Sequence, residues 1–304
     1  MNVLIVGLGS IAHKHVDALR KIDSSVSIYA LRSSTSSKHW EEITDLYAWE
    51  EVLEVRFDFV IVSNPTSEHK DSINKLLDLD IPLFIEKPLF HRLDIEEQVM
   101  ALFKSNKLTY VACNLRFLDA LLFVKQRMAD LKLRINEVNV YCGSYLPDWR
   151  KGVDYKKNYS AIPELGGGVH IDLIHEVDYV YWLFGIPHKI NRIFKKNSSL
   201  EICSYDYANY CMEYSNFCAG IVLNYYRRDA KRKLEIVCEE VTISVDLLQN
   251  TVWENGKIVF QSRQEIKDTY FEQMKYFIHC LSDNKQSFNT ILDAYRVLQI
   301  CLES

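Results

Sequence analysis

The first twelve residues decide the fold and read Met1-Asn2-Val3-Leu4-Ile5-Val6-Gly7-Leu8-Gly9-Ser10-Ile11-Ala12. The run 3–6 is typical of a buried parallel strand, and residues 7–12 fit the pattern Gly-x-Gly-x-x-Ala between a strand and a helix. The first glycine permits a tight turn, and the second lets the backbone approach a pyrophosphate at the start of the helix. The stretch therefore predicts a dinucleotide-binding loop that contains Gly7, Gly9, Ser10 and Ile11.

Strand-like and helix-like patterns alternate downstream of this loop. The apolar runs are residues 3–6, 26–31, 59–62, 83–85 and 108–112, and helical periodicity lies between them at 11–22, 69–79 and 95–104. Such alternation indicates right-handed βαβ units. We therefore predict an α/β protein whose first domain, residues 1–118, is a dinucleotide-binding Rossmann domain with a doubly wound parallel sheet.

The pattern changes after about residue 120. Strand-like runs follow one another at 137–145, 205–214, 219–226, 234–238 and 241–247, and Asn255-Gly256 predicts a hairpin between 251–253 and 258–260. Helices are expected near 166–184, 268–282 and 290–302. We predict that residues 119–304 form an α+β domain for substrate binding and oligomerisation, with a large, open, mostly antiparallel sheet. A sheet covered on one side leaves its other face for a partner subunit.

Composition excludes several classes of protein. The chain has 304 residues, 48% of them hydrophobic, and a formal net charge of −5 without a long basic run, so a nucleic-acid partner is not expected. It contains neither a run of about 18 apolar residues nor a signal-peptide pattern, which predicts a cytoplasmic protein without membrane contact. The eight cysteines include no Cys-x-x-Cys pair, so they are expected to be apolar core residues and not metal ligands.

The end of the second predicted strand bears on the choice of cofactor. NAD sites usually carry an acidic residue there, whereas this strand runs into Arg32-Ser33-Ser34-Thr35. Arg32 can pair with a 2′-phosphate, and Ser33 and Ser34 can donate hydrogen bonds to it. The sequence thus favours NADP(H), with NAD(H) still possible.

Two further stretches suit proton transfer. Glu86-Lys87-Pro88 follows an apolar run, and residues 166–179 read Gly-Gly-Gly-Val-His-Ile-Asp-Leu-Ile-His-Glu-Val-Asp-Tyr. A lysine at a strand end and an Asp/His pair one helical turn apart can exchange a hydroxyl proton. On one continuous helix Asp172 and His175 share a face, whereas His170 lies nearer the apolar side, which predicts a structural role for His170. A metal site is not favoured, because His170 and Asp172 would point in different directions.

The order and spacing of residues 7–12, 60–69, 86–88 and 166–179 resemble those of the Gfo/Idh/MocA oxidoreductases over nearly the whole chain. The resemblance implies hydride transfer between NAD(P) and a carbon of a sugar or cyclitol, with Lys87, Asp172 and His175 as catalytic residues. It also implies a cis bond before Pro88, and cofactor contacts from Asn64, Pro65, His69, Glu86 and Lys87. Many members place the histidine four residues after the aspartate. The spacing of three is similar to the branch with Asp-x-x-His-Glu, and it leaves open whether Lys87 or His175 donates the proton.

Other residues are expected near the substrate. Asn114 and Arg116 follow the last Rossmann strand, where ligands meet the carboxyl ends of strands, so Asn114 is expected to contact cofactor and Arg116 substrate. The aromatic and charged stretch 145–159 is typical of a substrate loop, with Trp149, Arg150, Tyr155 and Tyr159 as binding residues. Arg150, with Lys156 and Lys157 nearby, favours a sugar that is nucleotide-linked or acidic, although a neutral polyol stays open.

Two functions are consistent with these features of the sequence. The first is an NAD(P)-dependent sugar dehydrogenase or reductase that forms a homodimer or homotetramer through its open sheet face. The alternative is a non-catalytic dinucleotide-binding regulatory protein on the same scaffold. A regulator has no need of Lys87, Asp172 and His175 together, which favours the enzyme.

Overall fold

The apolar runs of the first part form a six-stranded parallel sheet in the computed structural model, which describes residues 1–36, 39–150 and 152–302. The strand order is β3-β2-β1-β4-β5-β6. Their bounds are β1 Asn2–Val6, β2 Ser27–Leu31, β3 Ile43–Leu46, β4 Phe59–Val62, β5 Leu83–Glu86 and β6 Thr109–Ala112. Every residue of β4, β5 and β6 is buried, as expected for a parallel sheet covered on both faces.

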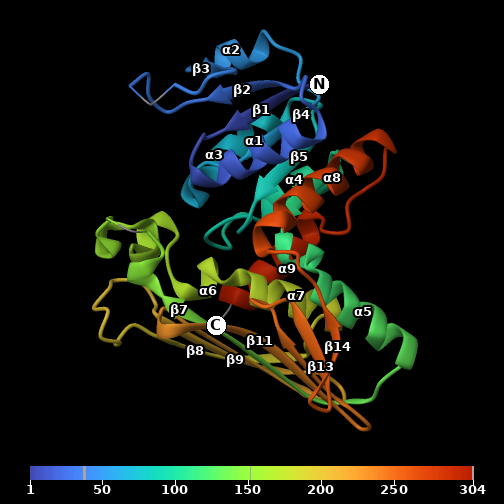
Figure 1. The fold of residues 1–304 in the computed structure, drawn as a ribbon. Coiled ribbons are helices and arrows are strands. Elements are labelled where there is room, and N and C mark those ends of the chain that lie inside the picture. Colours follow the sequence, from blue (N-terminus) through green and yellow to red (C-terminus); the bar gives the residue numbers. More distant parts are fainter. Residues whose placement is uncertain (37–38, 151, 303–304) are drawn as a thin grey trace. The chain divides into compact units, whose positions relative to one another are not determined.

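Helices connect these strands (Figure 1). They are α1 Ser10–Ile22, α2 Trp49–Leu53, α3 His69–Leu77 and α4 Glu96–Lys104. The order of strands reverses between β1 and β4, which is the switch point where doubly wound sheets bind ligands. The short strand β3 was not predicted.

The second sheet has eight strands in the order β14-β13-β12-β11-β7-β10-β9-β8. Their bounds are β7 Ile135–Tyr145, β8 Lys189–Lys195, β9 Tyr207–Glu213, β10 Cys218–Asn224, β11 Tyr226–Cys238, β12 Thr242–Asp246, β13 Thr251–Glu254 and β14 Lys257–Gln261. Neighbours pair antiparallel except for β7 and β10. The predicted hairpin joins β13 to β14, and both Asn255 and Gly256 have positive φ. The predicted fold class is therefore confirmed.

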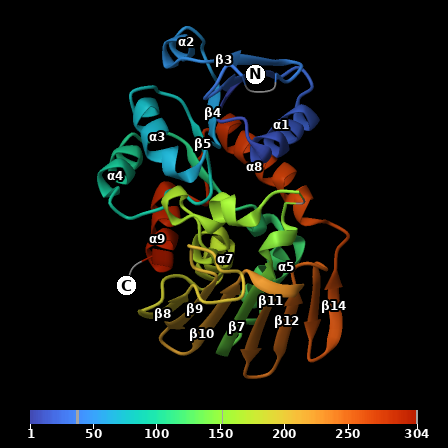
Figure 2. The same cartoon turned by 90° about the vertical axis from the view of Figure 1, so that its left-hand side faces the viewer.

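Helices α5 Asp119–Leu131, α6 Val169–Asp172 and α7 Ile174–Phe184 lie on one face of this second sheet (Figures 1 and 2). Burial alternates along the strands, for example in β9, because side chains of one face pack under the helices and those of the other face point outward. This alternation agrees with the expected one-sided sheet.

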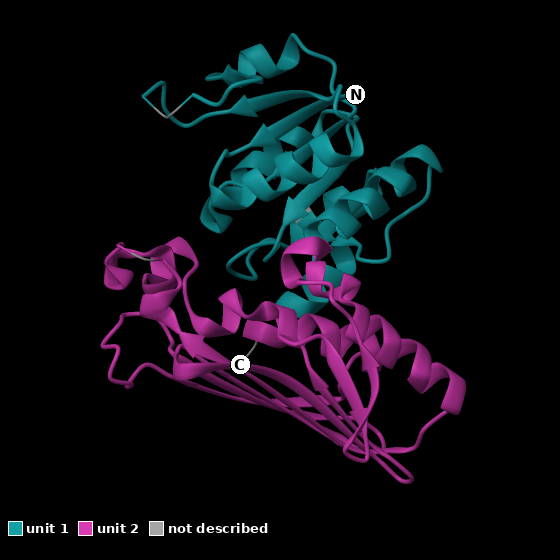
Figure 3. Cartoon of the chain, in the orientation of Figure 1, with its two compact units in different colours: residues 1–113, 270–298 teal, residues 114–269, 299–304 magenta. Residues whose placement is uncertain are grey.

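The chain divides into two compact units (Figure 3). Unit 1 comprises residues 1–113 and 270–298, and unit 2 comprises residues 114–269 and the described residues from 299 onward. Unit 1 thus includes most of helices α8 Thr269–Ser282 and α9 Ile291–Leu302, which the sequence-based division at residue 118 had grouped with the second domain. That division stays a prediction about domains. Within the described ranges, none of the helices combines the length and the apolar character that a membrane span requires.

Candidate functional site

A pocket of about 420 Å³ lies at the carboxyl ends of β1, β2 and β4 in unit 1. This is the edge of the sheet where the sequence predicted dinucleotide binding. Its lining includes most of the residues expected there from the glycine loop, the second strand and the stretch after β4, namely Gly7, Gly9, Arg32, Ser33, Asn64 and Pro65.

The glycine loop has the backbone geometry that its sequence requires. Gly7 has φ +87°, and a Cβ built on it would lie 2.5 Å from the Cα of Asn64, so only glycine fits this turn. Gly9 is the N-cap of α1, and a Cβ there would meet nothing within 4 Å. Because no side chain caps α1, its first N–H groups are available to an anion in the open space beside Gly9.

Asn64 and His69 link the pocket to the loop after β5. The Asn64 amide donates to the Ser72 hydroxyl at 2.8 Å, and its Oδ1 is buried without a hydrogen-bond partner among the described residues. The His69 ring contacts the carbonyl oxygens of Leu89 at 3.0 Å and Asn64 at 3.1 Å, and burial lowers its pKa. The unsatisfied Asn64 oxygen and the open Gly9 backbone both fit a bound dinucleotide, which carries amide donors and phosphates.

The structure adds an acidic residue that sequence reasoning missed. Asp45, on β3, accepts a hydrogen bond from the Arg32 guanidinium at 2.7 Å and contacts the His39 ring at 2.9 Å. The stretch after the second strand indeed lacks an acid, but the neighbouring strand supplies one. That strand, Ile43–Leu46, has only 4 residues, too few to give a recognisable strand pattern in the sequence.

The Glu86-Lys87-Pro88 motif ends β5, and its Lys87–Pro88 bond is cis, as the family resemblance implied. Glu86 is buried, and its Oε1 lies 2.6 Å from the Nε2 of His15 on α1. Its Oε2 accepts the Lys87 backbone N–H at 3.1 Å. Glu86 therefore fixes the lysine's backbone to the helix that begins at the glycine loop. His15, which no sequence pattern singled out, supplies the second half of this link.

In unit 2 the Gly-rich stretch leads into two helices where the sequence predicted one. A Cβ on Gly167 would collide with the carbonyl oxygen of Tyr159, and Gly168 has φ +131°. Helix α6 then ends at Asp172, and Leu173, with φ −95° and ψ 32°, interrupts the path before α7. The prediction that Asp172 and His175 share one face of a single continuous helix is therefore wrong, because the break at Leu173 changes the direction of the residues after it. Both side chains are nevertheless buried, as are all residues from Ile174 to Val180.

Asp172 is held by tyrosines. The Tyr225 hydroxyl, completely buried, donates to Asp172 Oδ2 at 2.5 Å. Tyr159 also hydrogen-bonds Asp172, and its pKa is raised by burial and by that carboxylate. Trp149 packs edge-on against the Tyr225 ring, with centroids 5.3 Å apart. Trp149, Tyr159 and Asp172, predicted separately for the substrate site, therefore belong to one cluster that is centred on Tyr225, a residue the sequence did not single out.

Arg150 lies at the outer side of this cluster. Its guanidinium donates to Asn158 Oδ1 at 2.9 Å and lies over the Tyr159 ring at 5.3 Å. The Tyr155 hydroxyl donates to the Leu200 carbonyl, and Lys156 pairs with Glu201 at 3.2 Å. Tyr155 and Lys156 thus connect the loop to residues 200–201, and the expected role of Lys156 near an anion stays a prediction.

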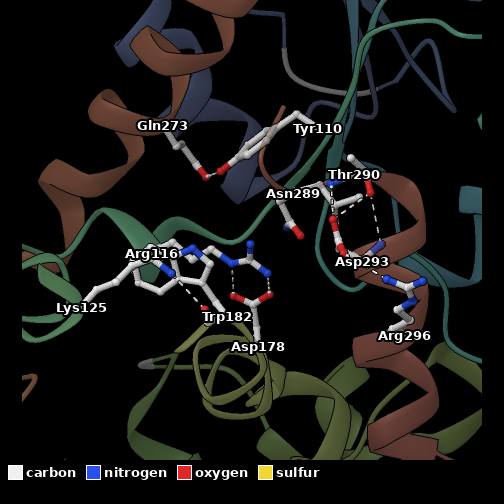
Figure 4. Close-up of polar contacts among 11 residues, drawn as sticks. Tyr110, Arg116, Lys125, Asp178, Trp182, Gln273, Asn289, Thr290, Asp293 and Arg296 are labelled. Atoms are coloured by element: carbon white, nitrogen blue, oxygen red, sulfur yellow. Dashed lines mark hydrogen bonds and ion pairs between the residues drawn. The ribbon is translucent and has the colours of Figure 1, made fainter. Parts of the chain in front are cut away.

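Two further acids on α7 form buried ion pairs. Arg116 donates to both oxygens of Asp178, at 2.9 and 2.7 Å, and both side chains are 1% exposed (Figure 4). Arg232 donates to Glu176 at 2.6 Å. The Arg116 guanidinium therefore holds α7 in place, and the expected contact of Arg116 with substrate stays a prediction. Asn114, expected at the cofactor, donates to the Thr269 hydroxyl at 2.6 Å.

His170 lies among aromatic rings. Its ring centroid is 5.0 Å from that of Phe194 and 5.2 Å from that of Tyr205. Burial lowers its pKa to about 4, so the ring is neutral at pH 7. This environment supports a structural role. Among the described residues, no group of three His, Cys, Asp or Glu side chains is placed to hold a metal ion.

Two models of known protein families match this chain. The model of an oxidoreductase family with an NAD-binding Rossmann fold matches residues 1–113, and the model of the same family's C-terminal alpha/beta domain matches residues 133–299. The chain belongs to the Gfo/Idh/MocA oxidoreductase family. Its N-terminal part is the NAD-binding Rossmann fold of that family, which supports a nicotinamide cofactor.

Solved structures of similar fold span the length of this Gfo/Idh/MocA chain. Myo-inositol 2-dehydrogenase from Lactobacillus plantarum is 17% identical, with a TM-score of 0.82 over 99% of this chain and 95% of that one. UDP-N-acetylglucosamine 3-dehydrogenase from Acidithiobacillus ferrooxidans is 17% identical, with a TM-score of 0.82 over 100% and 96%. Levoglucosan dehydrogenase, in complex with NADH and levoglucosan, is 14% identical, with a TM-score of 0.85 over 99% and 95%. The comparison with curated proteins gave no match.

Proposed function

We propose that this protein is a dehydrogenase or reductase that transfers hydride between a nicotinamide dinucleotide and a carbon of a sugar or cyclitol. The observation that carries the proposal is the unit 1 pocket, with the open backbone at Gly9 and the unsatisfied Asn64 oxygen. The substrate class follows from the similar structures, whose names are those of inositol, UDP-sugar and levoglucosan dehydrogenases.

Lys87 and His175 are the proposed acid/base groups, and Asp172 orients the substrate hydroxyl or the imidazole. The bound nicotinamide supplies the hydride acceptor or donor. A proton must move on or off the hydroxyl oxygen during that transfer, and lysine and histidine side chains both serve this role in enzymes. Tyr225 and Tyr159 support the role of Asp172 because their hydrogen bonds fix its carboxylate. The assignment to the Asp-x-x-His-Glu branch and the cytoplasmic location stay predictions from the sequence.

We propose NADP(H) as the favoured cofactor and NAD(H) as a usable one. Arg32 and Ser33 line the pocket beside the glycine loop, and Ser34 follows them in the chain. A guanidinium can pair with the 2′-phosphate that distinguishes NADP from NAD, and serine hydroxyls can donate to it.

The proposed substrate carries an anionic group. Arg150 lies beside Tyr159 at the outer side of the Asp172 cluster, and Trp149 offers an aromatic face 37% exposed. An arginine suits bidentate binding of phosphate or carboxylate, and an aromatic ring suits a sugar face.

A panel assay tests the proposal. NADP- and NAD-linked turnover is measured on nucleotide sugars, sugar acids and neutral cyclitols, for the wild type and Arg150→Ala. We expect the highest kcat/KM on an anionic sugar, with a drop in Arg150→Ala of roughly tenfold or more through KM. Best turnover on a neutral cyclitol, unchanged in Arg150→Ala, would refute the anionic substrate. Cofactor binding without turnover on any sugar would favour the regulatory alternative.

We also propose that the outward face of the unit 2 sheet contacts a second copy of this chain. Tyr141, Val222 and Trp253 line a hollow of about 700 Å³ there, together with the oppositely charged Lys233 and Glu235. Because a two-fold interface places one surface against itself, a face that carries both charges can be complementary to its copy. Sedimentation should show a dimer or tetramer that Val222→Asp dissociates and the exposed control Leu53→Asp does not. A wild type that is monomeric at every concentration would contradict this contact.

A further inference from the structure

Arg32, which lines the pocket, forms an ion pair with Asp45 on the neighbouring strand β3. Strands β2 and β3 run parallel, with Ala30 opposite Asp45, so the residue after β2 can reach the Asp45 side chain. The Arg32 Nη1 donates to Asp45 Oδ1 at 2.7 Å. The two side chains are only 7% and 8% exposed, so water screens the pair weakly.

The second oxygen of Asp45 is engaged as well. His39 contacts Asp45 Oδ2 at 2.9 Å and is itself 68% exposed. Burial alone raises the pKa of Asp45, but the hydrogen bonds from His39 and Arg32 outweigh it, and the pKa is lowered overall. The carboxylate is therefore ionised at neutral pH, next to a guanidinium that lines the dinucleotide pocket.

The negative charge of Asp45 opposes the attraction between Arg32 and the 2′-phosphate of NADP. The 2′-phosphate of NADP would meet Arg32 with the negative charge of Asp45 close behind the contact, whereas the 2′-hydroxyl of NAD carries no charge to be repelled. Juxtaposed like charges are costly at a partly buried site. A guanidinium already shared with a carboxylate also gives up part of that interaction when it binds a phosphate.

We propose that Asp45 is a specificity-determining residue of the dinucleotide pocket, which limits the preference for a 2′-phosphate by pairing with Arg32. The inference rests on the proposed function, since it requires the pocket to bind nicotinamide dinucleotides. It explains how one pocket can favour NADP(H) through Arg32 and still accept NAD(H).

Calorimetric titration of NADP(H) and NAD(H) tests the inference on the full chain without any substrate. Asp45→Asn keeps the size of the side chain and removes its charge. We expect the affinity for NADP(H) to rise roughly tenfold and that for NAD(H) to change by less than about threefold. Asp80→Asn, which removes an exposed acid between α3 and β5, is the control with the same change in net charge and should alter neither affinity.

The outcomes separate this inference from the proposed function. A wild type that binds neither NADP(H) nor NAD(H) overturns both the role of Asp45 and the dehydrogenase proposal. A wild type that binds either one, with an unchanged or lowered NADP-to-NAD affinity ratio in Asp45→Asn, overturns the role of Asp45 and leaves the dehydrogenase proposal standing. Thermal melts check the folding of each variant, and Asp45→Ser serves as a second variant if Asp45→Asn folds poorly.

Discussion

The dinucleotide pocket of unit 1 and the Asp172 cluster of unit 2 are built in different ways. The pocket is made by loops that each follow a strand directly, and its critical contacts involve backbone, as at Gly7 against Asn64. The Asp172 cluster is made by side chains far apart in the sequence, since Tyr225 is 53 positions from Asp172. Backbone geometry therefore limits substitution in the first site, and hydrogen bonds between side chains limit it in the second.

The largest effect is expected from removing the proposed acid/base groups. Lys87→Ala and His175→Ala should each lower turnover by on the order of 10² or more, because each removes a proposed proton donor or acceptor, while calorimetry shows cofactor binding nearly intact. His170→Ala is the control, since His170 packs between aromatic rings and should affect mainly stability. A folded His170→Ala without activity, beside an active His175→Ala, would exchange the roles assigned to these two histidines.

The next effect tests the backbone character of the pocket. Gly7→Ala places a Cβ against the Asn64 Cα at a positive φ, so the free energy of unfolding should fall by about 2 kcal/mol and cofactor affinity by more than about tenfold. Gly9→Ala meets no atom within 4 Å and should keep the stability while weakening cofactor binding alone. Denaturant titration and calorimetry measure both quantities. Equal stability of the two variants would mean that the turn tolerates a side chain.

An effect of similar size concerns pH and the buried His170. Its pKa of about 4 in the folded protein lies below the ordinary value of 6.5, so protonation favours the unfolded chain. The stabilising contribution of the neutral ring is complete above pH 6.5 and is lost as the pH falls towards 4, by roughly 2 to 3 kcal/mol. Denaturant titrations at pH 7 and pH 4.5 should show a smaller loss in His170→Phe than in the wild type. Parallel losses in both proteins would assign the acid sensitivity to other groups.

The smallest effect tests the tyrosine that holds Asp172. Tyr225→Phe keeps the ring but removes the hydrogen bond, and kcat should fall roughly tenfold with little change in KM. Tyr210→Phe is the matched control, because Tyr210 is equally buried and its hydroxyl donates to the Cys301 carbonyl. If both variants lost only stability, Tyr225 would be a packing residue and not a positioning residue.

The sequence predicted most of the pocket because its residues follow strands that local patterns reveal. The loop after Val6 and the stretch after Val62 could each be recognised from an apolar run and the residues next to it. Asp45 escaped notice because its four-residue strand carries a weak pattern. Its role depends on the pairing of β2 with β3, which sequence spacing does not encode.

In unit 2 the sequence identified residue types but not their partners. It predicted Trp149, Tyr159 and Asp172 for one site, yet the residue that joins them, Tyr225, lies between β10 and β11, far from them in the sequence. The partner of Arg116 was missed in the same way. The position of Arg116 after β6 suggested a ligand contact, and only the packing of α7 shows that Asp178 accepts its hydrogen bonds.

The sequence by itself determined the two-sheet fold, the glycine loop and the proposed Lys87 and Asp/His positions, because periodicity and turn chemistry act over a few neighbouring residues. The tertiary structure alone decided the break at Leu173, the tyrosine bonds to Asp172, and the pairing of Arg32 with Asp45. Those features depend on side chains that meet only after strands pair and helices pack, and the low dielectric of the folded interior gives such contacts their strength.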